Sequence, residues 1–156
     1  MKYVSTQDLS AFDNFFNELK VLENKKVSYG YFDERHYSGL NMATLAAIHE
    51  QGWNGLPQRD FIYSTQIAFK ADLNKMTRQL MYDIINRKGH EEGLRRIGNA
   101  GVKKMKYVID TGAFSNNTVS DNWAAVKGFN EALIHYGDLR EATSFKVTPY
   151  NPKERD

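Results

Sequence analysis

One apolar repeat constrains the fold of this chain more than any other feature. After Pro57, apolar or small side chains recur every three or four residues, the spacing of an amphipathic helix. The series is Ile62, Thr65, Phe69, Leu73, Met76, Leu80 and Ile84. Arg87 and Lys88 would form a cationic last turn, with Gly89 as the C-cap. With a rise of 1.5 Å per residue the helix would be about 40 Å long and would span the domain.

A second long helix is predicted over roughly residues 90–109. Its apolar face is formed by Leu94, Ile97, Gly101, Met105 and Val108. Gly93, Gly98 and Gly101 each cost about 1 kcal/mol of helix propensity. We therefore expect close backbone packing to compensate at these glycines.

Shorter elements flank these helices. Residues 7–23 have the spacing of an amphipathic helix that docks onto the core, and residues 26–32 and 144–147 have the composition of strands. Residues 42–51 predict a helix with Asn41 as its N-cap. The predicted fold class is α+β, with a small, mainly antiparallel sheet packed with two long helices and a short N-terminal helix.

Helical periodicity is lost between residues 111 and 141, where only residues 122–126 indicate a turn of helix. A loop region of this length is unusual in a small domain unless it is functional. It nevertheless carries the aromatic residues Phe114, Trp123, Phe129 and Tyr136. We predict one domain over residues 1–148, with residues 111–141 as an extended assembly region and residues 149–156 as a polar tail.

The connection between the 42–51 helix and the long helix is predicted to be a structural joint. Gly52 stands where a left-handed C-cap is needed, and Asn54-Gly55 followed by Pro57 turns the chain. Arg59 would form an ion pair, either with Glu50 in the same subunit, which we favour, or with an acidic residue of a neighbouring subunit. Phe61 begins the long helix.

Charge, cysteine content and the length of apolar runs limit the classes of function that this chain could have. The net charge is only +2, so the chain has no overall field that would attract nucleic acid. The absence of cysteine excludes disulfides and thiolate metal sites, and it suits a reducing cytoplasm. No run approaches the roughly 20 apolar residues of a membrane span, and no signal peptide is expected at the N-terminus.

Two short motifs suggest catalysis, but their surroundings do not support it. His49-Glu50 resembles the start of a zinc-protease helix, yet the second histidine is replaced by Trp53. The run Val-Ile-Asp110-Thr-Gly-Ala resembles an aspartic-protease signature. Here it ends a helical pattern, so we interpret Gly112 as a helix cap.

The order of these motifs resembles a family of tailed-bacteriophage neck and tail-completion proteins. The matching positions at the joint are His49, Glu50, Gly52, Pro57, Arg59 and Phe61. Those nearer the C-terminus are Lys127, Gly128, Leu133, Ile134, Gly137, Leu139 and the strand at 144–147. The likeness covers roughly residues 27–147, and the chain departs from the family pattern at Gln51, Asp60 and His135-Tyr136.

The resemblance implies a structural virion protein that is not an enzyme and needs no cofactor. Its expected partners are further copies of itself in a ring, with a hexamer favoured and a dodecamer as the alternative. Further expected partners are the adjacent connector or neck protein and the tail-tube protein. The genomic DNA is also expected to contact the ring non-specifically as it passes through. Phe114, Trp123, Phe129, Tyr136 and Leu139 are the expected assembly interface. The expected location is the virion, assembled in the host cytoplasm, without membrane contact.

The alternative is a soluble nucleic-acid-binding module. The predicted second helix carries five cations within residues 95–106, namely Arg95, Arg96, Lys103, Lys104 and Lys106. No aromatic residues are interleaved with them in a way that would stack bases. A solvated helix face is therefore the favoured interpretation of these charges.

Overall fold

The computed structural model describes residues 10–36, 38–128, 130, 132–133 and 137–151. Within these residues the elements are α1 (Ser10–Glu23), β1 (Lys25–Gly30), α2 (Met42–Gln51), α3 (Phe61–Ile85), α4 (Glu91–Thr111), α5 (Asp121–Lys127), α6 (Asp138–Glu141) and β2 (Ser144–Pro149). The two strands form one antiparallel sheet. The predicted α+β class, with two long helices beside a small antiparallel sheet, is confirmed.

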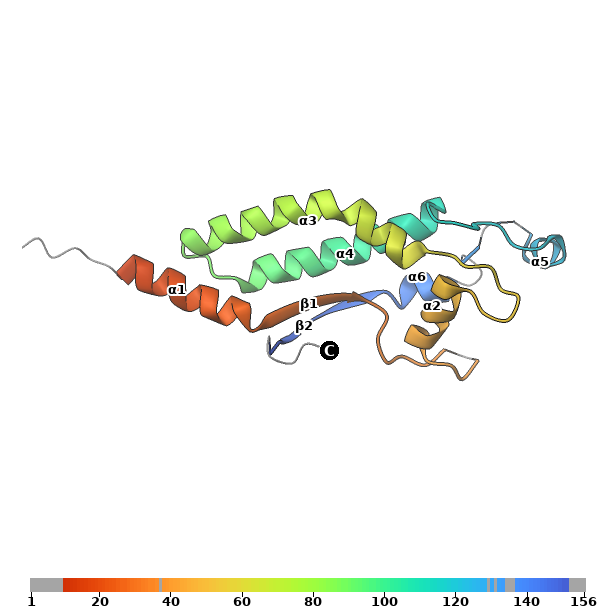
Figure 1. The fold of residues 1–156 in the computed structure, drawn as a ribbon, viewed down its shortest axis with the longest axis horizontal. Helices are drawn as coiled ribbons and strands as arrows, with labels where there is room; N and C mark the ends of the chain where they lie inside the picture. Colours follow the sequence, from red (N-terminus) through yellow and green to blue (C-terminus); the bar gives the residue numbers. More distant parts are fainter. Residues whose placement is uncertain (1–9, 37, 129, 131, 134–136, 152–156) are drawn as a thin grey trace, which may run out of the picture.

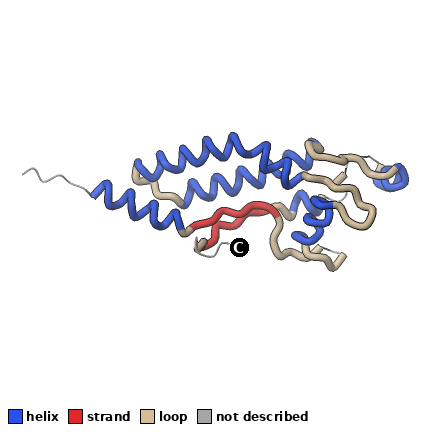
Figure 2. The backbone as a smooth tube through the Cα atoms, in the orientation of Figure 1, coloured by secondary structure: helices blue, strands red, loops and turns tan. Residues whose placement is uncertain are grey.

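The molecule is elongated, and its long axis follows α3 and α4 (Figure 1). These two helices lie side by side, and α4 lies between α3 and the sheet. Figure 2 shows the strands below the helix pair, with α1 at one end and α2, α5 and α6 at the other. The ends of the molecule are therefore built from different segments of the chain.

The glycines of α4 allow the sheet to approach the helix closely. A Cβ atom at Gly98 would overlap the ring of Phe145, and one at Gly101 would stand 2.6 Å from two ring atoms of Tyr29. Tyr29 and Phe145 are directly paired across the two strands. The close packing predicted from these glycines is confirmed, and it is aromatic rings that fill the space.

Two clusters of buried side chains form the core, and α3 and α4 contribute to both. The first lies toward α2 and α6 and contains Met42, Ala46, Phe61, Met105, Val108, Ile109 and Leu139. The second lies toward α1 and contains Leu80, Ile84, Leu94 and Ile97. The apolar faces predicted for the two long helices thus face the core.

The end of α3 differs from the prediction. The helix stops at Ile85, so Arg87 and Lys88 are not in its last turn and Gly89 is not its cap. The Arg87 amide bonds to the Ile84 carbonyl and the Lys88 amide to the Asp83 carbonyl, which is a Schellman motif. Arg87 supplies the left-handed residue of that motif, with a φ of 59°. Glycine usually occupies this position, so the pattern of residues pointed to a later end.

The first helix packs more loosely than predicted. It has no buried residue; Phe15 and Leu22 rest against the second core cluster. Glu18 also bonds through Oε2 to Nδ1 of His90, 2.6 Å away. Phe12 and Phe16 are 62% and 56% exposed. One apolar stripe of α1 therefore docks and the neighbouring one faces solvent.

The region 111–141 contains more helix than its sequence indicated. The predicted turn at residues 122–126 is confirmed as α5, whose N-cap Ser120 accepts a hydrogen bond from the Trp123 amide. The short helix α6 was not predicted. At the other end of the chain, β2 includes Pro149, and the Tyr150 amide bonds to the Asn24 carbonyl. The start of the predicted tail therefore pairs with the sheet.

Candidate functional site

Glu50 joins α2 to α3 by capping the longer helix. Its Oε2 accepts the Ile62 amide at 2.8 Å, and its Oε1 accepts the Tyr63 amide at 3.0 Å. These amides belong to the first turn of α3, where no intrahelical acceptor exists. Asp60, the residue at the N-cap position, makes no such bond. A carboxylate from the end of one helix thus stabilises the positive end of the next.

The loop between α2 and α3 is a tight reversal. The amide and carbonyl of Trp53 bond to those of Leu56, and Asn54 and Gly55 occupy the turn with φ values of 47° and 85°. Gly52 has a φ of 74°, and a Cβ there would stand 2.9 Å from backbone atoms of Leu56 and Gln58. Its ψ of 147° differs from the predicted left-handed cap. Glycine is required there by both the φ value and the close approach of the chain.

Arg59 has partners different from the one we favoured. No ion pair links it to Glu50, because the Glu50 carboxylate is turned toward the amides of α3. The guanidinium donates from Nε to the Asn116 carbonyl at 3.2 Å and from Nη1 to His49 Nδ1 at 3.1 Å. A longer contact of 3.5 Å reaches the Thr118 carbonyl. Arg59 therefore connects the joint to the region 111–141.

Two further hydrogen bonds link the joint to the start of region 111–141. The Ser115 amide donates to Oδ1 of Asp60 at 2.7 Å, and this bond lowers the pKa of Asp60. The side-chain amide of Asn116 donates to the Gln58 carbonyl, also at 2.7 Å. These contacts span more than fifty residues of sequence. The joint and the start of region 111–141 are consequently one structural unit.

The five residues expected to form an assembly interface differ in how far their side chains are buried, and two of them lie outside the described part of the chain. Leu139 is 5% exposed within the first core cluster, and Phe114 is half-buried with its ring 6.3 Å from that of Phe61. Leu139 is therefore enclosed in the core, and Phe114 is covered on the side that contacts Phe61. Trp123 is 45% exposed. Phe129 and Tyr136 lie outside the residues that the structure describes.

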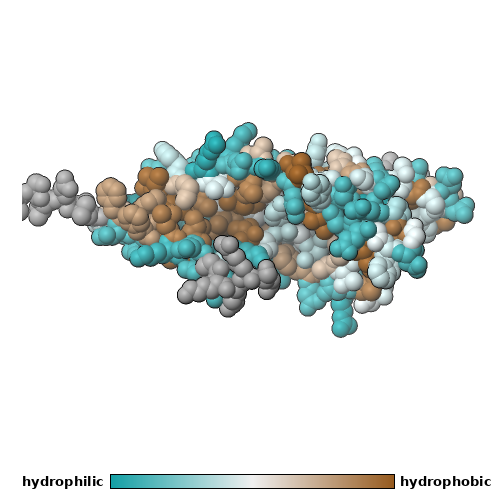
Figure 3. Space-filling model, in the orientation of Figure 1, coloured by the Kyte–Doolittle hydropathy of each residue, from teal (hydrophilic) through white to brown (hydrophobic). Residues whose placement is uncertain are grey.

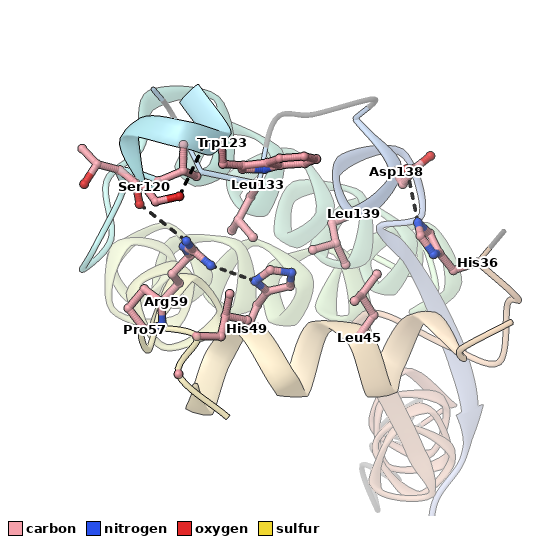
Figure 4. A pocket seen from close by; sticks show the side chains of 14 residues that line it. His36, Leu45, His49, Pro57, Arg59, Ser120, Trp123, Leu133, Asp138 and Leu139 are labelled. Carbon is pink, nitrogen blue, oxygen red and sulfur yellow. Dashed lines mark hydrogen bonds and ion pairs between the residues drawn. The ribbon is translucent and has the colours of Figure 1, made fainter. Parts of the chain in front are cut away.

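A cavity of about 510 Å³ lies where the joint meets α5 and α6. Its lining includes Arg59 and His49 from the joint, Trp123 from α5, and Asp138 and Leu139 from α6. Figure 4 shows Arg59 and His49 side by side, with the Trp123 indole on the opposite side. Leu45, Leu56 and Leu133 add apolar surface. This cavity is the candidate functional site.

The electrostatics of the cavity are dominated by one buried cation. Arg59 is 4% exposed, and burial lowers its pKa. Burial, together with the charge of Arg59, lowers the pKa of His49 to about 4, so this imidazole is neutral near pH 7. His36 and Asp138 lie at the far side, with His36 Nε2 3.3 Å from Asp138 Oδ2. Sequence reasoning missed this pair, because its members are far apart in the chain and belong to no motif.

The basic helix is largely neutralised by acidic neighbours. Arg96 is paired with Asp83, Lys104 with Asp72 at 2.9 Å, and Lys106 with Glu141 at 3.2 Å. Three of the five cations that a nucleic-acid interface would use therefore have carboxylate partners within the subunit. This arrangement fits the prediction that α4 presents a solvated face.

Asp110 lies in the last turn of α4, as the interpretation of Gly112 as a helix cap requires. Gly112 has a left-handed conformation with a φ of 60° and caps the helix. Both carboxylate oxygens of Asp110 accept from Arg140, at 2.6 and 3.0 Å. The Arg140 hydrogen bonds lower the pKa of Asp110. A carboxylate held in this way suits an ion pair that ties α4 to α6.

Comparison with models of known protein families, with curated proteins and with solved structures finds no match. In the part of the chain that the structure describes, no helix combines the length and the apolar composition that crossing a membrane requires.

The joint is expected to lose stability as the pH falls from about 6.5 to about 4. The unfolded chain protonates His49 near pH 6.5, whereas the folded protein does so only near pH 4. The stability that follows from this difference is therefore fully present above the pKa of His49 in the unfolded chain. It is lost as the pH falls through the pKa of His49 in the folded protein. Allowing for partial exposure, wild type should lose about 1.5 kcal/mol more than His49→Asn between about pH 7 and 4.5.

Urea denaturation of both proteins at the two pH values measures this difference. Asparagine is the matched control, because its side-chain oxygen can accept the Arg59 bond without titrating. Equal losses in the two proteins would contradict the assignment of a neutral His49.

Proposed function

We propose that this protein is a structural subunit of the neck or tail-completion region of a tailed-phage virion. In this role it forms a ring between the capsid connector and the tail, and DNA passes through the ring. A hexamer is favoured, with a dodecamer as the alternative. The proposal takes its virion location and its partners from the sequence resemblance described above.

The observation that carries the proposal is that two groups of motif positions, which are far apart in the sequence, lie close together in the structure. The positions that match the family pattern lie in two groups, at residues 49–61 and 127–147. In the structure, Phe61 and Leu139 share one core cluster, and Leu133 packs against it. Arg59 also bonds to the segment that leads into the second group. Three motif positions that are far apart in sequence thus pack together, and this proximity supports the proposal.

The distribution of exposed apolar side chains also suits a ring. A ring is closed by heterologous contacts, in which each subunit uses two different surfaces. Phe12, Phe16 and Ile85 are more than half exposed at the α1 end, where apolar side chains gather on the visible face (Figure 3). Trp53 and Trp123 are 70% and 45% exposed in segments at the opposite end. The subunit therefore offers two separate apolar surfaces.

Native mass spectrometry of the purified protein, alone and mixed with the connector and tail-tube proteins of its phage, tests the proposal. We expect a monomer or weak oligomers alone and a closed ring in the mixture, because assembly surfaces that lack a partner pay an ordering cost on binding. Trp123→Ala should reduce ring formation without lowering the melting temperature. Asn99→Ala, at an exposed position of α4 that belongs to neither surface, is the control.

Three outcomes would overturn the proposal. The first is absence of the protein from purified virions by peptide mass spectrometry. The second is a mixture that contains only monomer. The third is tight binding of the monomer to duplex DNA in a gel shift, which would favour the nucleic-acid-binding module.

A further inference from the structure

The buried charge of Arg59 has no acidic partner among the described residues. The two carboxylates of the joint are engaged elsewhere: Glu50 caps α3, and Asp60 accepts the Ser115 amide. Within the described part of the chain, the Arg59 guanidinium bonds to two carbonyls and one neutral imidazole. A buried cation without an opposite charge is costly, and buried charges in proteins are normally paired. The subunit thus holds a site that would gain stability from an added anion.

Donor groups remain available at this site. A guanidinium carries five N–H donors, and the three hydrogen bonds of the Arg59 side chain to described residues use one on each nitrogen, which leaves two. His49 accepts from Arg59 at Nδ1, so its neutral ring carries the proton on Nε2, and no described residue accepts it. Both residues line the cavity (Figure 4). The cavity therefore presents N–H groups from two neighbouring side chains.

The charge balance of the cavity selects a singly charged anion. Arg59 supplies the positive charge, while His49 is neutral near pH 7. Asp138, with its side chain 34% exposed, lines the same cavity and would repel a second negative charge. A phosphate group carries about 1.5 to 2 negative charges near pH 7, whereas a carboxylate carries one and fits the planar fork of arginine. Carboxylate is thus the better match.

The remaining lining indicates how the carboxylate is carried. Trp123, Leu45 and Leu133 surround the donors with apolar surface, which would contact carbon atoms next to the charged group. A free carboxylate such as acetate has almost no such carbon surface. An acidic side chain that stands between apolar residues of a polypeptide offers both the carboxylate and the apolar surface next to it.

We propose that the cavity binds a glutamate or aspartate side chain presented by a partner protein. Arg59 donates to the carboxylate from its unused N–H groups, His49 donates from Nε2, and Trp123 covers the adjoining apolar part of the partner. The carboxylate supplies the counter-charge that the described part of the subunit does not give to Arg59. This inference holds whether or not the protein forms the ring proposed above, because it rests on the cavity alone.

Titration of the full-length protein with a blocked Gly-Leu-Glu-Leu-Gly peptide tests the inference by calorimetry. The control is the same peptide with glutamine in place of glutamate. We expect the glutamine peptide to bind about 10- to 100-fold more weakly, since it loses charge-assisted hydrogen bonds. In a Trp53→Phe background, the glutamate peptide should also change the fluorescence of Trp123. Acetate and inorganic phosphate should bind more weakly than the glutamate peptide.

Two substitutions locate the binding in the cavity. Arg59→Lys keeps the charge but removes the fork, and it should weaken the glutamate peptide by about tenfold. Because Arg59 also holds the 116–118 backbone, circular dichroism must first show that the variant is folded. Trp123→Ala, at a half-exposed position, is the second variant and should weaken both peptides by a similar factor.

The inference is overturned if the two peptides bind wild type equally or not at all. Preference for phosphate would overturn the choice of a monoanion, and acetate binding as strong as that of the peptide would overturn the choice of a protein partner. Unchanged peptide affinity in Trp123→Ala would exclude this cavity as the binding site.

Discussion

Replacing Phe61 by alanine is expected to lower the free energy of unfolding by about 3–5 kcal/mol. The Phe61 side chain is fully buried at the start of α3. Its ring makes edge contacts with Tyr31 and Phe114, with centroid distances of 6.0 and 6.3 Å. Alanine would remove these contacts and leave a cavity between α2, α3 and α4 that the surrounding helices can fill only in part.

Chemical denaturation with a fluorescence or circular dichroism signal measures this loss. Tyr63→Ala is the matched control, because Tyr63 lies two residues along the same helix but is 57% exposed. Its substitution should change the stability by about 0.5 kcal/mol or less. A Phe61 variant as stable as the Tyr63 variant would show that the joint does not depend on this ring.

The second large effect is expected from Gly101→Ala, which should destabilise the protein by about 1–3 kcal/mol. Alanine is the better helix former by about 1 kcal/mol, so helix propensity alone predicts the opposite sign. The added methyl group would collide with the Tyr29 ring. That ring cannot swing aside freely, because it also packs against Phe69 with a centroid distance of 5.6 Å.

Asn99→Ala provides the comparison for this prediction. Asn99 is exposed on the same helix, so alanine there gains propensity without a collision. Thermal denaturation should show a lower melting temperature for Gly101→Ala and an unchanged or higher one for Asn99→Ala. If both substitutions stabilise the protein, then the sheet does not rest on the glycine face of α4 as described.

Much of the fold could be predicted because its main features are local. The spacing of Leu94, Ile97, Met105 and Val108 defines one face of α4, and all four side chains are buried. Asn41 was predicted as an N-cap, and its side chain accepts the Ala43 amide at 2.8 Å. Such signals depend on neighbours within a few residues, so they can be recognised without knowledge of the tertiary structure.

The candidate site was only partly predictable, because tertiary contacts define it. Arg59 was singled out from its motif, but its bonds to the 116–118 backbone depend on how a distant segment returns to the joint. The same return buries Leu139 and half-buries Phe114, two residues that were expected at an assembly interface. The left-handed conformation of Arg87 likewise has no local marker, because glycine usually occupies that position.

The sheet has a consequence for the order of folding. Its strands come from opposite ends of the chain, since Tyr29 pairs with Phe145. Closing such a long loop costs chain entropy before any pairing energy is gained, and pairings of this kind raise the contact order and slow folding. The α3–α4 pair is local in sequence and can form while the chain is still being synthesised. During that time Gly98 lacks its aromatic cover, because Phe145 follows α4 in the chain. The packing of the helix pair stays incomplete until the last strand leaves the ribosome.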